Sequence, residues 1–182
     1  AGATMQWLRD GLGLIKTSAQ SEAIAAALTD NGGVYLVPAF AGLGAPQWNA
    51  GARGAIFGLT RDSTSAHVVR AGLEAVAYQT RDLLDALKAD GARVEALLVD
   101  GGMTANGWAM QFLADVCAVE VRCPAFQEVT ALGAAKLAAL GAGRVKALAE
   151  IPEAQTRARW APAMAAGKRE ALRAGWDGAV RG

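Results

Sequence analysis

The spacing of hydrophobic residues along the 182-residue chain changes repeatedly between a helical and a strand pattern. Apolar positions three or four residues apart predict helices over residues 1–10, 21–28, 65–90, 106–116 and 131–140. Short apolar runs next to turn residues predict strands at residues 34–37, 55–57, 97–99 and 119–121. Helices that alternate with strands are typical of an α/β domain with a parallel element in its sheet. The run at 97–99 is continuously apolar, which predicts a strand buried on both faces.

The longest predicted helix is amphipathic. Ser65 is the candidate for its N-cap, and Gly91 follows its end. Its apolar stripe is expected to consist of Val69, Leu73, Val76, Leu83 and Leu87. The carboxylates Glu74, Asp82 and Asp85 lie on the same helix and are predicted to form a solvated face. After residue 141, the chain is predicted to be Ala- and Arg-rich helix that Pro152 and Pro162 interrupt.

Composition and charge narrow the class of protein. Hydrophobic residues make up 53% of the chain, enough for a sizeable core, and the net charge of +1 gives no reason to expect nucleic acid or an acidic membrane as a partner. No apolar run is long enough to span a bilayer, and the first residues do not resemble a signal peptide. Cys117 and Cys123 lack metal-site spacing and are expected to be free thiols. These features predict a cytoplasmic protein.

The turn after residue 99 is the first candidate for a ligand site. Asp100-Gly101-Gly102 follows a predicted strand, and Asn106 lies at the start of the next helix. Glycines allow the backbone to approach a ligand closely, and a helix N-terminus offers free N–H groups. An ordinary turn in which Asn106 only caps the helix would have the same sequence, and this alternative stays open.

Three other segments have weaker signals. Gly2 and Gln6 begin the chain with a small residue and an amide at a helix start, where a simple helix terminus is the alternative. Small residues at 131–135 indicate close helix packing. The loop at 42–48 is either a mobile functional loop or a tight turn anchored by Trp48. The single histidine, His67, is expected to be solvated, and no catalytic triad, Walker loop or GxGxxG motif is present.

Six segments resemble those of a known family in their residues and in their order along the chain. The chain resembles the glycerol kinases of the FGGY carbohydrate kinase family at GATMQWLRD (2–10), VYLVPAFAGLGAPQW (34–48), ARGAIFGLTR (52–61), LEAVAYQTRD (73–82), VDGG (99–102) and EVTALGAA (128–135). The stretch from Gly54 through Gln79 also resembles the second signature of the wider family. The resemblance extends from residue 2 to about residue 140 and returns at Ala174-Gly175-Trp176.

The resemblance implies a fold and a site. It implies that the chain is the C-terminal, nucleotide-binding domain of an actin-like ATPase (ribonuclease H-like) fold that lacks its first strands. Gly2, Gln6, Gly102 and Asn106 match positions that contact the nucleotide in the family, and Gly101 lies in the same turn. Residues 131–135 match a small-residue connecting helix of the fold.

The resemblance also implies an activity for a larger parent enzyme. That activity is phosphorylation of glycerol to sn-glycerol 3-phosphate by ATP with Mg²⁺. The glycerol pocket and the general base lie in the family's N-terminal domain, so this chain contains no catalytic or metal-binding residue and is expected to be inactive alone. Its partner is the remainder of the same kinase, and intact family members are commonly dimers or tetramers. The alternatives are another FGGY kinase acting on a sugar or polyol, a non-catalytic nucleotide-binding module, and a structural interaction domain.

A sheet without its first strands would expose an unpaired edge and apolar surface. We therefore expect the chain to be stable only beside the rest of the kinase. The measurement is thermal unfolding of the isolated chain at low concentration, followed by circular dichroism. A sharp, cooperative transition of a monomer would contradict this expectation.

Overall fold

The computed structural model describes residues 2–125, 129–152 and 155–182. Residues 1 and 128, which belong to two of the predicted segments, lie outside the described part. The helices are α1 (Gly2–Gln6), α2 (Gln20–Ala27), α3 (Ser65–Ala89), α4 (Gly107–Cys117), α5 (Val129–Gly141) and α6 (Ala166–Arg181). Between them lie the π-helical segment η1 (Trp7–Gly11) and the 3-10 turns η2 (Gly102–Ala105) and η3 (Leu148–Glu150). The strands are β1 (Tyr35–Val37), β2 (Ala55–Phe57), β3 (Ala96–Leu98), β4 (Glu120–Pro124) and β5 (Thr156–Trp160).

The strands form two small sheets. β1 and β2 pair antiparallel, with Leu36 opposite Ile56. The second sheet has the order β3-β4-β5; β3 and β4 are parallel, with Leu97 opposite Val121, and β5 runs antiparallel to β4. The crossover between β3 and β4 contains α4, as parallel neighbours require. The prediction of an α/β domain with a parallel element is confirmed.

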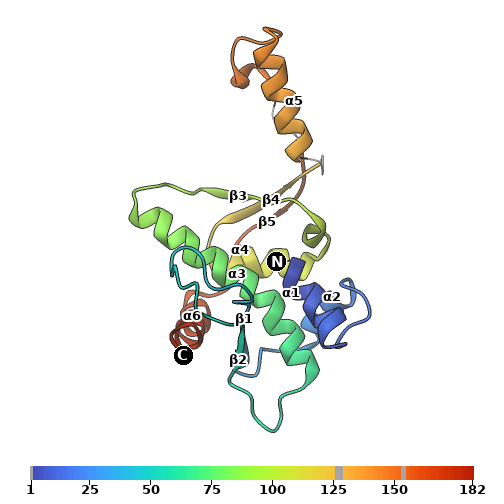
Figure 1. Ribbon diagram of the computed structural model, residues 1–182, viewed down its shortest axis with the longest axis vertical. Coiled ribbons are helices and arrows are strands. Elements are labelled where there is room, and N and C mark those ends of the chain that lie inside the picture. The colour runs from blue at the N-terminus through green and yellow to red at the C-terminus, as the bar shows by residue number, and fades with distance from the viewer. Residues whose placement is uncertain (1, 126–128, 153–154) are drawn as a thin grey trace.

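Helix α3 is the central element of the body (Figure 1). α4 lies beside it, α1 and α2 flank it, and β1 runs against it. Val69, Leu73 and Tyr78 of its buried side are each at most 2% exposed. Leu83 and Leu87, predicted for the same stripe, are 44% and 40% exposed, whereas Leu84, which was not predicted for it, is 3% exposed.

Gly72 of α3 allows the N-terminal helical segment to pack closely against α3. A Cβ on Gly72 would lie 2.7 Å from Leu8 Cδ1 and 3.1 Å from Met5 Cε. Both of these side chains are buried, so they have little room to move. The missing side chain therefore allows the N-terminal helical segment to lie directly on α3, which fixes the position of Gly2 and Met5.

The carboxylate of Glu74 is buried at the centre of this arrangement and is 0% exposed. Its Oε1 accepts a hydrogen bond from Arg70 Nε at 2.8 Å, and its Oε2 accepts from Asn31 Nδ2 at 3.0 Å and from Tyr78 at 3.1 Å. Burial, followed by the charge of Glu74, raises the pKa of Tyr78, so its hydroxyl keeps the proton that it donates. The prediction that Glu74 belongs to a solvated face is wrong, because these three donors compensate the loss of water.

Arg70 connects the buried Glu74 to the neighbouring helices α2 and α4. Its Nη1 donates to the carbonyls of Ala25 at 3.3 Å and Leu28 at 2.5 Å, at the C-terminal end of α2. Its guanidinium carbon lies 5.0 Å from the ring centroid of Trp108 on α4. Since a helix C-terminus carries partial negative charge, the buried cation stabilises this end of α2.

The C-terminal region differs from the predicted helical tail. Residues 156–160 form β5, which covers the free edge of β4, and the helix begins only at Ala166. Trp176 of α6 is 2% exposed, stacks on Tyr78 with ring centroids 5.2 Å apart, and donates from Nε1 to Asp82 Oδ2 at 2.8 Å. Burial raises the pKa of Asp82, which is thus not a fully solvated carboxylate either. In the segment at 174–176, where the family resemblance returns, Trp176 therefore has a packing role.

Three further predictions need correction. Leu98 is 77% exposed, so β3 is not buried on both faces; it lies at the edge of its sheet with no strand on its outer side among the described residues. The cap of α3 is Thr64, not Ser65, and His67 completes a capping box with it. Trp48 is 79% exposed and does not anchor its loop.

Other expectations agree with the structure. Cys117 and Cys123 are buried free thiols, and burial raises the pKa of Cys117 to about 12, which makes it a poor nucleophile. Arg81 Nε lies 2.7 Å from Asp85 Oδ1, which forms an ion pair at i,i+4 on α3. Within the described ranges, no helix is both long and apolar enough to cross a bilayer.

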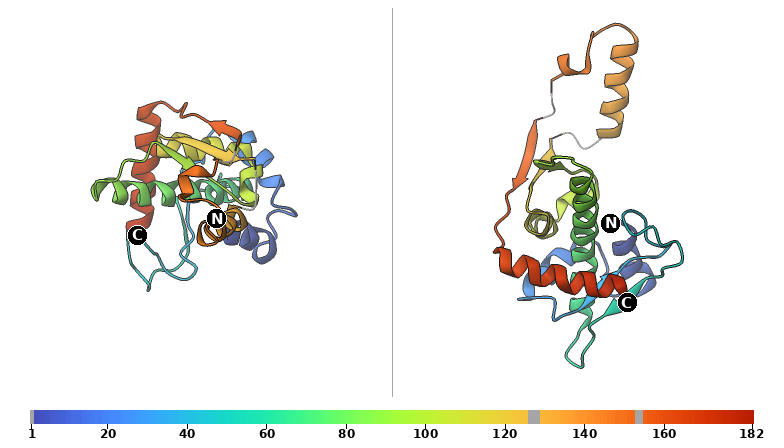
Figure 2. Two further views of the ribbon diagram at one scale, coloured as in Figure 1. Left: turned by 90° about the horizontal axis from the view of Figure 1, so that it is seen from above. Right: turned by 90° about the vertical axis from the view of Figure 1, so that its left-hand side faces the viewer.

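Helix α5 projects away from the body (Figure 2). None of its residues is buried, and Leu137 is 61% exposed. The helix contains a single charged residue, Lys136, so most of the surface that it leaves in water is apolar.

We predict that replacing Glu74 by Ala lowers the free energy of unfolding by about 3–5 kcal/mol, because Arg70 is left buried without its carboxylate. Urea denaturation of the chain assembled with the rest of the kinase, followed by tryptophan fluorescence, measures the change. The matched control is Asp10→Ala, which removes the exposed pair with Arg9 and is expected to have a much smaller effect. A Glu74→Ala loss no larger than that of the control would show that the buried pair does not stabilise the fold.

Candidate nucleotide site

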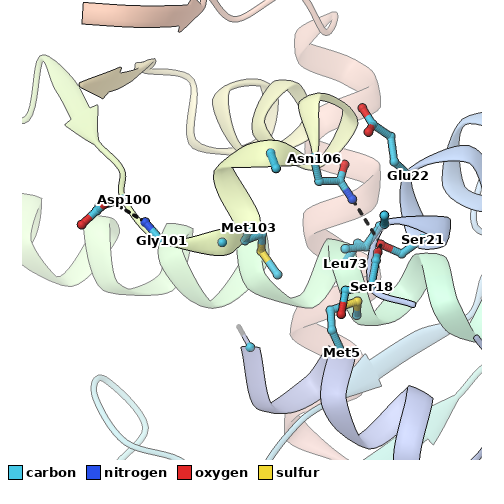
Figure 3. Close-up of a pocket in the computed structure, with 13 residues that line it drawn as sticks. Met5, Ser18, Ser21, Glu22, Leu73, Asp100, Gly101, Met103 and Asn106 are labelled. Carbon is cyan, nitrogen blue, oxygen red and sulfur yellow. Dashed lines mark hydrogen bonds between the residues drawn. The ribbon is translucent and has the colours of Figure 1, made fainter. Parts of the chain in front are cut away.

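A cavity of about 510 Å³ opens between the N-terminal helices, α3 and the turn that follows β3 (Figure 3). Its volume lies within the range of small-molecule sites in proteins. The lining residues are Gly2 and Met5 from α1, Ser18 and Ala19 just before α2, Ser21 and Glu22 from α2, Leu73 from α3, and Asp100, Gly101, Gly102, Met103, Ala105 and Asn106 from the turn.

Glycine at position 101 makes the turn after β3 possible. Gly101 has φ +91°, a conformation that disfavours a side chain. Asp100 Oδ1 accepts from the N–H of Gly101 at 2.6 Å, and the hydroxyl of Thr104 donates to the carbonyl of Gly101 at 2.8 Å. Among the described residues, apart from the chain neighbours of each glycine, no heavy atom lies within 4 Å of where a Cβ of Gly101 or Gly102 would be. The backbone of the turn therefore borders open space.

Asn106 has two roles in the structure. It is the N-cap of α4, where its Oδ1 accepts from Ala109 N at 2.8 Å. Its Nδ2 donates to Ser21 Oγ at 3.3 Å, and the hydroxyl of Ser21 in turn donates to the carbonyl of Ser18 at 2.6 Å. The capping role that the sequence left open is therefore present, and the same side chain also lines the cavity.

Glu22 caps α4 from another helix. Its Oε1 accepts from Gly107 N at 2.9 Å and from Trp108 N at 3.3 Å. With Asn106 bonded to the next N–H group, the first amides of α4 all have partners within the protein. The expectation that this helix N-terminus offers free N–H groups to a ligand is wrong, because the carboxylate of Glu22 already occupies that position.

The structure brings together four of the five predicted site residues. Gly2, Gly101, Gly102 and Asn106 all line the cavity, although about a hundred residues of sequence separate the first from the others. Gln6 lies at the C-terminal end of α1, is exposed, and is outside the set that lines the cavity. Together with Arg9, which has the larger effect, Gln6 lowers the pKa of Asp10.

Sequence reasoning missed the contribution of α2. Ser18, Ser21 and Glu22 supply the polar groups opposite Asn106, but 85 residues separate Ser21 from Asn106. The only local signal was a pair of serines and a glutamate near a helix start, which is usual for a helix terminus. Nothing in that pattern indicates which other element the side chains contact.

The remaining candidate segments lie elsewhere. The loop at 42–48 borders a smaller cavity of about 230 Å³ together with Gln79, Asp82 and Trp176. Residues 131–135 belong to the projecting helix α5 (Figure 1). In the described part of the chain, no group of three or more His, Cys, Asp and Glu side chains could hold a metal ion.

The side chains that line the main cavity are suited to binding a ligand. Met5, Leu73 and Met103 supply apolar lining. Polar side chains lie where α2 meets Asn106, and Asp100 lies on the other side, in the turn after β3 (Figure 3). Apolar surfaces that flank a few convergent polar groups suit a flat heteroaromatic ring. The lining residues include no nucleophile paired with a base, so the arrangement is suited to holding a ligand rather than reacting with it.

Comparison with known proteins identifies the class. The model of the C-terminal domain of the FGGY family of carbohydrate kinases matches residues 1–142. The chain therefore belongs to the FGGY family of carbohydrate kinases. The crystal structure of a xylulose kinase from Rhodospirillum rubrum matches 98% of the chain with a TM-score of 0.82 at 28% identity, and the match covers 37% of that protein.

More similar relatives are glycerol kinases. The chain is 58% identical over 182 residues to the glycerol kinase of Rhodospirillum centenum and 53% identical to glycerol kinase 1 of Pseudomonas aeruginosa, and it matches along its whole length in both. The crystal structure of Plasmodium falciparum glycerol kinase with ADP matches 99% of the chain with a TM-score of 0.88 at 34% identity. The chain spans only 36% of that protein and 36–37% of the two bacterial relatives.

We predict that Asn106→Ala lowers the free energy of unfolding by about 1 kcal/mol, the usual loss for an N-cap. Asn106→Asp is expected to recover most of this loss, since a carboxylate still accepts from Ala109 N but cannot donate to Ser21. Urea denaturation of the two variants and the unsubstituted chain, each assembled with the rest of the kinase, measures the difference. Equal losses in both variants would contradict the capping role.

Proposed function

We propose that this chain is the C-terminal, nucleotide-binding domain of a glycerol kinase and that it holds the adenosine part of ATP. The observation that supports this most is the convergence of Gly2, Gly101, Gly102 and Asn106 on one cavity. By resemblance, Gly2, Gly102 and Asn106 match nucleotide-contacting positions of the family, and Gly101 lies in the same turn. The Plasmodium falciparum neighbour was crystallised with ADP. We keep Gln6 in the proposed site as a residue near the cavity that a bound nucleotide would reach.

The parent enzyme would phosphorylate glycerol to sn-glycerol 3-phosphate at the expense of ATP. Bound ATP would supply the phosphoryl group, and Mg²⁺ would neutralise charge on its phosphates. The described residues present no metal cluster, so the Mg²⁺ ligands would be phosphate oxygens and groups of the remaining enzyme. The part of the chain in this structure would bind and orient the nucleoside. Alignment of the reacting groups and neutralisation of their charge would also need the rest of the enzyme.

The rest of the kinase is the proposed partner, and α5 is the surface that we assign to it. The chain covers little more than a third of its relatives' length, so a large part of the parent protein lies outside it. α5 has no buried residue and exposes apolar side chains, which is costly in water unless another part of the protein covers them. We further propose that the intact enzyme is cytoplasmic and a homo-oligomer.

A second candidate function is phosphorylation of another polyol or sugar by an FGGY kinase. The similarity to a xylulose kinase structure favours it at the level of the fold. Identities above 50% to proteins named glycerol kinase favour glycerol over this alternative. A non-catalytic nucleotide-binding module would keep ATP binding without phosphoryl transfer.

The first experiment is an assay of glycerol-dependent ADP release. The chain alone is expected to be inactive, and its mixture with the separately expressed upstream part of the protein is expected to be active, because catalysis needs both walls of the cleft. Activity in a folded, assembled mixture with another polyol but not with glycerol would favour the second candidate. ATP binding without transfer to any polyol would favour the non-catalytic module.

We predict that Ala105→Trp in the assembled protein raises the KM for ATP at least tenfold, because the indole fills part of the cavity that Ala105 lines. The matched control is Ala92→Trp, an exposed residue outside the cavity, which should leave the KM unchanged. Steady-state kinetics at varied ATP concentration test the pair of variants. An unchanged KM in Ala105→Trp would place the nucleotide elsewhere.

A further inference from the structure

A second cavity, of about 210 Å³, lies where the C-terminal end of α2, one side of α4 and the start of α6 meet. It shares no lining residue with the larger cavity, so it is separate from the proposed nucleotide site. Its volume is below the usual range of sites for drug-sized ligands, which suits an ion or a molecule of few heavy atoms.

Arg70 lines this cavity and has a donor to spare. The residue is only 6% exposed; its Nε donates to Glu74, and its Nη1 donates to two carbonyls at the end of α2. The other terminal nitrogen, Nη2, has no hydrogen-bond partner in the part of the chain that the structure describes, and it is not sealed from solvent. Because the cavity is the open space that Arg70 borders, this donor is available to a ligand there.

Two other donors without a partner line the same cavity. The ammonium group of Lys168 and the hydroxyl of Thr29 make no hydrogen bond or ion pair with any of the described residues. Lys168 lies in the first turn of α6, where no side chain caps the helix and no acidic residue is present. Since a helix N-terminus carries partial positive charge, α6 and Lys168 both favour a negative charge at this place.

The carboxylate that lines the cavity, Asp115, is already engaged. Its Oδ1 accepts from Gln111 Nε2 at 3.0 Å and from the N–H groups of Ala163 and Met164 at 2.6 Å and 3.0 Å. Three donors at one oxygen weaken the repulsion that this carboxylate exerts on a nearby anion. Among the described residues, no ion pair joins Asp115 to Lys168, so the charge of Lys168 remains available to a ligand.

An aromatic pair forms the apolar side of the cavity. Trp108 and Phe112 of α4 both line it, and their rings stack with centroids 5.2 Å apart and planes 9° apart. The guanidinium carbon of Arg70 lies 5.0 Å from the centroid of the Trp108 ring, which holds the cation beside this surface. The cavity therefore combines fixed donors with a rigid apolar surface large enough for a short carbon chain.

We propose that this cavity binds a phosphate group, either as the free ion or as the monoester of a short organic molecule. The oxygens of a phosphate dianion only accept, so they match the donors of Arg70, Lys168 and Thr29. Three donors from three different elements suit a tetrahedral oxyanion better than a planar carboxylate. The carbon chain of a monoester would lie on Trp108 and Phe112. The inference goes beyond the proposed function and does not depend on it.

Isothermal titration calorimetry of the intact protein to which we assign this chain tests the site. Inorganic phosphate and propyl phosphate are titrated separately, with glycerol and a non-hydrolysable ATP analogue present in excess to block the proposed active site. At least one of the two probes is expected to bind. Equal affinities would assign the cavity to the free ion, and tighter binding of propyl phosphate would assign it to a monoester. Absence of binding of both probes at millimolar concentrations would overturn the inference.

Lys168→Glu locates the binding. The affinity for the probe is expected to fall about tenfold or more, because the variant loses a charge-assisted hydrogen bond and gains a like charge. Lys168 is exposed, and glutamate is favourable in the first turn of a helix, so the fold should be kept. The matched control is Lys88→Glu, which makes the same change in net charge at an exposed residue outside the cavity and should leave the affinity nearly unchanged. Equal affinities in the two variants would overturn the inference.

Discussion

The buried carboxylate of Glu74 is the constraint on which the rest of the structure depends. An ionised group out of water is stable only when donors surround it, and here the donors come from Arg70 and Tyr78 on the same helix and from Asn31 in the loop before β1. Arg70 has the same requirement and meets it with carbonyls at the end of α2 and with the ring of Trp108. Glu74 and Arg70 each pair with the other and with groups on neighbouring elements. These contacts hold α2, α3 and α4 in one relative arrangement.

This arrangement decides the geometry of the cavity through α2. The C-terminal end of the helix is attached to Arg70, while residues at its N-terminal end contact α4 through Ser21 and Glu22. A shift of α2 would therefore move the polar groups that face Asn106. Gly72 adds a second constraint, because it allows α1 to approach α3 closely enough for Gly2 and Met5 to complete the wall.

The chemistry of the cavity fits the place of this chain in the FGGY family. The match to the C-terminal domain model covers residues 1–142, and β5 and α6 beyond it close the edge of β4 and pack Trp176 on Tyr78. The body of the chain thus has a continuous core, while α5 stands outside it with no buried residue. Within the described residues, the cavity is thus built against this core, and α5 lies apart from it.

The sequence alone determined the positions of most helices and strands, the α/β class and the family, because periodicity and turn residues act over short distances along the chain. It also indicated Gly2, Gly101, Gly102 and Asn106 through their resemblance to the family. It did not reveal β5, the exposure of Leu98 or the burial of Glu74, since each depends on which element lies opposite. Only the tertiary structure decided that Glu22 caps α4 and lines the cavity with Asn106, because a carboxylate near a helix start has the same local pattern whether it faces water or a distant segment of the chain.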